Sequence, residues 1–332
     1  MGRRFYTRAV YFYSKVDLTY QSLAAIVPIY VMILTGVLVR RIGWLKPEAD
    51  SSFVRMAIDV TLPCFIIYNM LGNEKLKSVG FSLATIFIGM LVVLASLAVS
   101  YAASRLLRLK VGGGERTFVV TTAFHNYGFF IIALVAILFA GSADSELLGL
   151  VLTHNVGCDL IFWSVGLFLL SNSSKFSVKV FLRGPVIAVF IGLFLIWTGI
   201  GEIIPDFVSN SMKWIGGCAI PMNLFMFGTL ICDMYGHSKI DYRVVATGVF
   251  VRMAVMPLIF IIAAWLLPVD LSLKKLIVLQ ALPPCAVTAA VLSKDFNGKP
   301  DLSVHITLAT CFVAIFTLPL WMNFGFSLIG AF

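Results

Sequence analysis

Long apolar segments alternate with short polar ones along almost the whole chain of 332 residues. A helix needs about 20 mostly apolar residues to cross the ~30 Å hydrocarbon core of a membrane. Continuous apolar runs of this length favour a helical bundle over an outer-membrane β-barrel, whose strands alternate apolar and polar positions. The pattern predicts an all-α membrane protein with ten spans, at 22–41, 51–71, 80–104, 117–140, 146–170, 179–200, 212–235, 243–267, 275–293 and 302–325.

The composition excludes an ordinary soluble protein. Hydrophobic residues make up 60% of the chain and charged residues 12%, whereas soluble domains average about 25% charged. The net charge of +9 is explained by Lys and Arg in cytoplasmic loops, so no nucleic-acid partner is expected. The six cysteines lie in apolar windows without CxxC spacing, which predicts neither disulfides nor a metal site. No cofactor is expected.

Charge in the loops indicates an orientation in an inner (plasma) membrane. Most Lys and Arg follow the odd-numbered spans, which places both termini outside by the positive-inside rule. The basic tail, with Arg3, Arg4, Arg8 and Lys15, opposes this orientation. Residues 1–17 have no long apolar core and no cleavage site, so they are interpreted as an interfacial segment and not as a signal peptide.

A weak internal repeat relates the two halves of the chain. Shifted by about 158 residues, Pro63 falls on Pro221 and Asn126 falls on Pro284. The halves are expected at 18–171 and 178–332, with five helices each. An odd number of helices per half makes the halves inverted, which is a common design of secondary transporters.

Two predicted spans contain helix-breaking residues near their middles. Span 4 has His125-Asn126-Tyr127-Gly128, in which Asn and Gly tolerate non-helical backbone, and span 9 has Pro283-Pro284, which lack two N–H donors. Freed N–H groups can hold an anion and freed carbonyls a cation. A Pro pair that only kinks span 9 is the alternative. The expected substrate-binding residues are His125, Asn126, Tyr127, Gly128, Gln280, Pro283, Pro284 and Arg252.

Ionisable residues at membrane depth cost about 2.5–3.5 kcal/mol each on insertion scales, so each is a candidate functional group. Asn155 and Asp159 are four residues apart and share a helix face, which is typical of a proton-relay or cation site. His154 and Asp59 are further candidates for the coupling ion. A structural ion pair between Asp159 and Arg252 is the alternative.

Arg252 and His125 each allow two interpretations. The guanidinium of Arg252 suits a substrate carboxylate, but an arginine that only packs between helices fits the sequence as well. His125 titrates in the right range to carry a coupled proton, and a core histidine bonded to freed backbone is the alternative.

An ordered set of short motifs resembles the auxin efflux carrier family of membrane transporters, in the bile-acid/sodium symporter-like superfamily. The resemblance runs from about Leu18 to the C-terminus. It rests on Ile26-Val27-Pro28, Gly36, Arg40-Arg41-Ile42-Gly43, Leu62-Pro63, Asn126-x-Gly128-Phe129, Gln280-Ala281-Leu282-Pro283 and Leu318-Pro319-Leu320-Trp321.

The resemblance implies ten helices in two inverted five-helix repeats, with broken fourth and ninth helices that cross at the substrate site. Asn126 and Pro283-Pro284 would mark this crossing. It also implies a small organic acid as substrate, and the short loop between spans 5 and 6 is typical of bacterial-type members. Ile131 and Ala133 stand where the family usually has Gly and Pro, and His125 is unusual beside Asn126. These departures indicate a divergent specificity.

We therefore predict a secondary transporter, or permease, for a small organic anion or carboxylate. It would work by alternating access at the span 4/span 9 crossing, coupled to H⁺, Na⁺ or the membrane potential. Its partners would be the substrate and the lipid bilayer. The sequence does not decide whether the protein forms a homodimer. An intramembrane enzyme is an alternative, but HExxH, GxSxG and paired-aspartate signatures are absent from the sequence. A channel or a sensor domain is the third functional interpretation.

Overall fold

The chain folds into helices. The computed structural model describes residues 2–110, 112–142, 144–171, 183–234, 240–296 and 298–331, and these contain no β-strand. Seven helical segments within them are long and apolar enough to cross a membrane, which confirms the predicted all-helical, multi-pass membrane protein. They are Tyr20–Arg41, Pro47–Met70, Val79–Leu106, Leu147–Ser171, Asp206–Asp233, Tyr242–Leu266 and Pro300–Leu328.

Several of these segments comprise two or more helices joined end to end. Single π-helical turns at 57–61, 162–166 and 251–255 link α2 to α3, α7 to α8 and α12 to α13. Helix α1 continues without a break from the predicted interfacial segment into the first span. The helices are α1 (Gly2–Arg41), α2 (Asp50–Met56), α3 (Leu62–Met70), α4 (Val79–Leu106), α5 (Glu115–Ala123), α6 (Phe130–Leu138), α7 (Leu147–Ile161), α8 (Leu167–Ser171), α9 (Gly184–Thr198), α10 (Asp206–Gly217), α11 (Ala219–Met234), α12 (Tyr242–Phe250), α13 (Met256–Leu266), α14 (Leu271–Ala281), α15 (Thr288–Asp295) and α16 (Pro300–Leu328).

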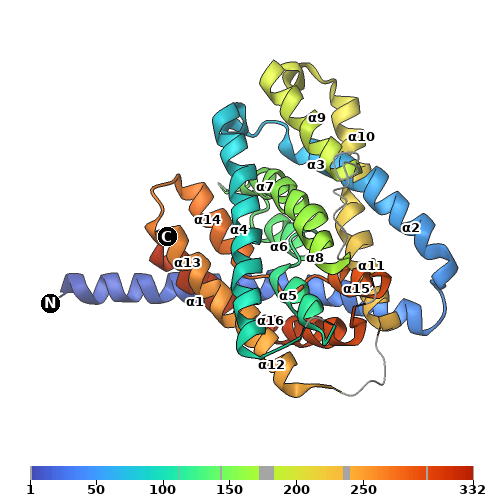
Figure 1. The fold of residues 1–332 in the computed structure, drawn as a ribbon. Helices are drawn as coiled ribbons and strands as arrows, with labels where there is room; N and C mark the ends of the chain where they lie inside the picture. Colours follow the sequence, from blue (N-terminus) through green and yellow to red (C-terminus); the bar gives the residue numbers. More distant parts are fainter. Residues whose placement is uncertain are drawn as a thin grey trace.

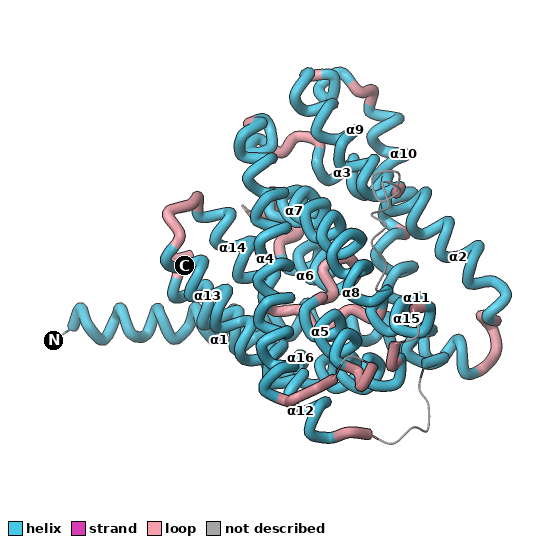
Figure 2. Tube along the Cα trace, viewed as in Figure 1, coloured by secondary structure: helices cyan, strands magenta, loops and turns pink. Residues whose placement is uncertain are grey.

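Two predicted spans are each divided by a non-helical segment. The span at 117–140 is divided into α5 and α6 by residues 124–129, and the span at 275–293 into α14 and α15 by residues 282–287. The span at 179–200 begins outside the described residues and contains α9. Non-helical chain therefore lies inside the bundle as well as at its two ends (Figure 2).

The helices form two groups. In the first, α1 packs along α11, and α3 packs against α9 and α10; α3, α9 and α10 lie together at the upper right of Figure 1. In the second, α4 packs against α5 and α7, α13 against α14, and α16 against α5, α12 and α15. Contacts of α1 with α6 and α16, and of α3 with α7, join the two groups. Both broken segments belong to the second group.

Each group contains a helix pair whose backbones approach closely at glycine. A Cβ atom on Gly36 of α1 would lie 2.1 Å from the carbonyl oxygen of Phe225 in α11. A Cβ atom on Gly157 of α7 would lie 1.9 Å from the carbonyl oxygen of Ile86 in α4. Small residues permit such contacts between membrane helices, where van der Waals packing drives association. These glycines therefore set the spacing of the two principal helix pairs.

Ion pairs gather four connecting segments on one face of the bundle. Lys75, between α3 and α4, lies 2.7 Å from Asp270, which precedes α14, and 3.7 Å from Glu146, which precedes α7. Lys77 lies 3.2 Å from Glu202, between α9 and α10. The segments that follow predicted spans 2, 4, 6 and 8 are thus on the same face.

Candidate functional site

The two helix breaks lie against each other inside the bundle. The main-chain nitrogen of Asn126 donates to the carbonyl oxygen of Pro284 at 2.8 Å, and that of Ala286 donates to the carbonyl of Phe124 at 2.9 Å. His125 and Cys285 thereby form an isolated antiparallel bridge. Unpaired main-chain groups are costly within a membrane, so each break supplies hydrogen bonds that the other has lost.

Asn126 also caps the start of α6. Its Oδ1 atom accepts hydrogen bonds from the backbone nitrogens of Phe129 and Phe130, at 3.1 and 3.3 Å. The first N–H groups of a helix have no intrahelical partner, and a side-chain oxygen of Asn is a preferred acceptor for them. The same residue therefore joins the breaks through its backbone and ends one of them through its side chain.

Arg252 caps the C-terminal end of α14, as Asn126 caps the start of α6. This fully buried side chain donates from Nε to the carbonyl oxygen of Pro283 at 3.0 Å, and from Nη2 to that of Ala281 at 2.9 Å. The last carbonyls of a helix carry partial negative charge and favour a cation. The alternative of an ion pair between Arg252 and Asp159 is not what the structure has, because the guanidinium donates to main-chain oxygens freed by the Pro pair.

A chain of side-chain hydrogen bonds connects the breaks to α7. His125 Nε2 lies 2.9 Å from Gln280 Oε1, and Gln280 Nε2 donates to Asn155 Oδ1 at 3.2 Å. Asn155 Nδ2 donates to the carbonyl oxygen of Tyr127 at 3.0 Å, and the Tyr127 hydroxyl donates to Asp159 Oδ1 at 2.7 Å. Such networks in a low-dielectric interior hold their members in fixed positions.

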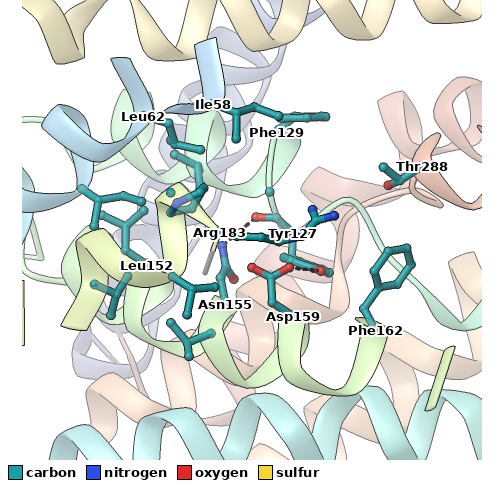
Figure 3. Close-up of a pocket in the computed structure, with 18 of the residues that line it drawn as sticks. Ile58, Leu62, Tyr127, Phe129, Leu152, Asn155, Asp159, Phe162, Arg183 and Thr288 are labelled. Carbon is teal, nitrogen blue, oxygen red and sulfur yellow. Dashed lines mark hydrogen bonds between the residues drawn. The ribbon is translucent and has the colours of Figure 1, made fainter. Parts of the chain in front are cut away.

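A cavity of about 380 Å³ opens beside this network. Apolar side chains of the segment before α3, of α6, α7 and α9 form most of its wall, and polar groups converge in one part, as in many small-molecule sites. Figure 3 shows Tyr127, Asn155, Asp159 and Arg183 grouped there. The polar and charged lining residues are Asp59, His125, Asn126, Tyr127, Asn155, Asp159, Arg183 and Thr288.

Two lining residues present nitrogen atoms without a protein partner. Asn126 is 3% exposed and His125 is fully buried, yet Asn126 Nδ2 and His125 Nδ1 form no hydrogen bond to the described protein. A buried polar group that lacks a partner costs about 1–3 kcal/mol. At the first break, these two buried atoms are thus left without a hydrogen bond from the described protein.

Arg183 is the functional candidate that sequence reasoning missed. It immediately precedes α9, lines the cavity, and places its guanidinium 3.4 Å from the ring centroid of Trp163. It also interacts electrostatically with Asp159 and Asp59. The insertion-cost argument that selected Arg252 applies equally to Arg183, because both lie within predicted spans.

Some of the other residues predicted from the sequence line the cavity, and the rest lie outside its lining. Asp59, Asn155, Asp159 and Gly128 line the cavity together with His125, Asn126 and Tyr127. Gln280, Pro283, Pro284, His154 and Arg252 do not line it.

His154 is buried behind the wall, with Nδ1 3.5 Å from Cys158 Sγ. Arg252, predicted to contact the substrate, donates from Nε and Nη2 to the main chain of α14 and the second break and does not line the cavity. Among the described residues, no group of three His, Cys, Asp or Glu side chains is placed to hold a metal ion.

The helical spans, the paired breaks and the cavity beside them are the features of a multi-pass membrane protein of the transporter class. It belongs to the membrane transport protein family, that of the auxin efflux carriers, whose model matches residues 21–179 and 173–322.

Two curated proteins illustrate the relationship. An uncharacterized transporter from Methanothermobacter thermautotrophicus is 26% identical over 309 residues, covering 90% of this chain and 97% of that protein. Probable auxin efflux carrier component 9 from Oryza sativa subsp. japonica is 24% identical over 144 residues, covering 42% of this chain and 33% of that protein.

Proposed function

We propose that this protein is a secondary transporter that carries a small organic anion across an inner (plasma) membrane by alternating access. The substrate binds in the cavity beside the paired breaks at 124–129 and 282–287. In this proposal the chain has ten spans in two inverted repeats, and the broken spans are the crossing fourth and ninth. The single observation that carries the proposal is the cavity itself, which lies beside the paired breaks and is lined by Asn126 and His125, each with a side-chain nitrogen that has no partner in the described protein.

The donors of the cavity favour an anion with a carboxylate group. Arg183 is the one Lys or Arg among the described lining residues. Its planar guanidinium suits bidentate binding of a carboxylate. Asn126 Nδ2 adds a neutral donor at the N-terminal end of α6, where the helix dipole favours negative charge. The apolar wall, which includes Phe129 and Phe162, accommodates the rest of the molecule.

The two helix groups provide the moving parts. The breaks and α7 belong to the second group, whereas Leu62, Val186 and Val189 come from α3 and α9 of the first. Access would alternate when the second group shifts against the first. The wall from the first group is apolar apart from Asp59 and Arg183, so the contacts that such a shift would change are chiefly those of Arg183 with Asp159 and Trp163. The related uncharacterized transporter and auxin efflux carrier component support transport of this kind.

Transport by purified protein in liposomes tests the proposal. Proteoliposomes preloaded with unlabelled succinate, malate, acetate or indole-3-acetate are diluted into the labelled form of the same acid, and counterflow is recorded. We expect saturable counterflow of at least one acid, and its loss in Asn126→Ala. The matched control is Asn223→Ala, because Asn223 is a buried asparagine of α11 that bonds within its own helix and lies outside the cavity. Equal counterflow in wild type and Asn126→Ala would refute the proposed site.

A further inference from the structure

Asp159 is the acidic group at the centre of the polar part of the cavity. Its carboxylate accepts a hydrogen bond from the Tyr127 hydroxyl at 2.7 Å and another from the Trp163 indole. It is half-buried and lines the cavity. The carboxyl group of Asp159 is therefore directed into the protein and not toward lipid.

The ionisable groups around Asp159 come from four elements. Tyr127 and His125 belong to the first break, Arg183 precedes α9, Asp59 lies in the turn before α3, and Cys158 is on α7 itself. Of the described lining residues, the second break contributes only Ala286, and α15 contributes Thr288. The cavity thus contains one permanent cation, Arg183, and two carboxyl groups, Asp59 and Asp159.

This balance opposes the entry of an anion alone. With both aspartates ionised and His125 neutral, the lining carries one net negative charge, and the charge of Asp159 acts on Arg183 from nearby. A substrate carboxylate would add a second net negative charge in a low-dielectric cavity, where like charges interact strongly. Protonation of Asp159 removes this obstacle, because Arg183 is then free to pair with the substrate.

We propose that Asp159 is the proton-coupling residue, and that each substrate anion enters with one proton. This inference rests on the proposed anion transport. The carboxylate of Asp159 gains the proton as an O–H group, and the substrate carboxylate takes its place as the counter-ion of Arg183. One negative charge and one positive charge are added together, so the net charge of the cavity does not change. An inward proton gradient would then drive uptake.

The contacts of Asp159 favour a proton over a sodium ion. Both of its hydrogen-bond partners are donors, the Tyr127 hydroxyl and the Trp163 N–H, and an indole N–H cannot coordinate a metal. A cation bound there would also be repelled by the guanidinium of Arg183. A proton requires neither additional oxygen ligands nor space.

Proton uptake on binding tests the inference. Purified protein in detergent is titrated calorimetrically with succinate, malate, acetate and indole-3-acetate, in two buffers of different ionisation enthalpy, in Na⁺ and in K⁺ salts. For an acid that binds, we expect about one proton taken up per anion, and an affinity that falls by up to about tenfold per pH unit on the alkaline side. Replacement of Na⁺ by K⁺ should change nothing.

Variants assign the proton to its residue. In Asp159→Asn we expect no proton uptake and an affinity that no longer varies with pH, whereas Asp59→Asn should keep the pH dependence. Glu202→Gln, an exposed acid outside the cavity, is the control and should match the wild type. If Asp159→Asn does not fold, the number of protons taken up by the wild-type protein still tests the inference.

Three outcomes would overturn the inference. Binding without proton uptake, or dependent on Na⁺, would refute proton coupling while leaving anion transport intact. Retention of the pH dependence in Asp159→Asn, with its loss in Asp59→Asn, would move the coupling to Asp59. Failure of all four acids to bind would overturn the proposed anion substrate and the coupling together.

Discussion

The backbone nitrogen of Asn126 and the carbonyl oxygen of Pro284 form a 2.8 Å hydrogen bond, and these are the two residues that the internal repeat of the sequence superposes. Each is located where a span is interrupted, so the bond joins two points that the predicted repeat makes equivalent. Main-chain groups freed in one break are satisfied by the other. The cavity beside them therefore has a rigid polar edge in an otherwise apolar bundle.

The side chain of Asn126 has two separable tasks. Substitution Asn126→Ala removes the oxygen that caps α6, which should lower the free energy of unfolding by about 1 kcal/mol. It also removes Nδ2 from the cavity. Asn126→Asp keeps an oxygen acceptor for the cap but has no N–H donor for an anion. We expect Asp to retain more thermal stability than Ala, with both variants inactive in counterflow. Full transport by Asn126→Asp would show that Nδ2 does not contact the substrate.

Arg252 should matter for stability more than for affinity. Substitution Arg252→Met leaves the carbonyls of Ala281 and Pro283 without their buried donor, and we expect a loss of about 1–3 kcal/mol in the free energy of unfolding. The melting temperature in detergent measures this loss. The affinity of the remaining folded protein for the acid identified by counterflow should change little. A weakened affinity at an unchanged melting temperature would show instead that Arg252 contacts the substrate.

Arg183 should decide whether an anion is bound. In Arg183→Gln the cavity loses its permanent cation, so we expect the affinity for a carboxylate to fall by about 1.5–3 kcal/mol, the contribution of a hydrogen bond to a charged group. Arg183→Lys keeps the charge but not the planar fork, and should fall between wild type and Gln. Calorimetric titration compares the three proteins. Equal affinity in all three would exclude Arg183 as the anion ligand.

The ion pair between Lys75 and Asp270 should make stability depend on acid pH. The Lys75 ammonium, hydrogen-bonded to Asp270, holds the pKa of that carboxyl below its ordinary value, and the Ser272 backbone acts in the same direction. The stabilisation is therefore present above the ordinary pKa of about 4 and is lost as the pH falls through the lowered folded value. Its size should stay below about 1 kcal/mol, because the pair is partly exposed.

The variant Asp270→Asn isolates this charge, since Asn still offers an oxygen to cap α14. We expect a small deficit in melting temperature relative to wild type at neutral pH. The deficit should shrink toward about pH 3 and at high salt. A deficit that is the same at every pH would assign the effect to packing and not to charge.

The sequence alone determined the class of protein and the positions of its breaks. Seven of the ten predicted spans correspond to long apolar helices, because hydrophobic length in a membrane is a local property. The breaks are local too, since Pro283-Pro284 lack the N–H groups that a helix needs. The shared face of Asn155 and Asp159 follows from helical spacing, and both line the cavity.

Only the tertiary structure decided which arginine faces the cavity. Spacing along a helix gives the direction of a side chain relative to its neighbours on that helix, but not the rotation of the helix within the bundle. Arg252 and Arg183 both lie within apolar predicted spans, yet the packing of α12 and α13 turns Arg252 toward the end of α14, whereas the start of α9 presents Arg183 to Asp159. The direct pairing of the two breaks likewise depends on contacts between segments far apart in the chain.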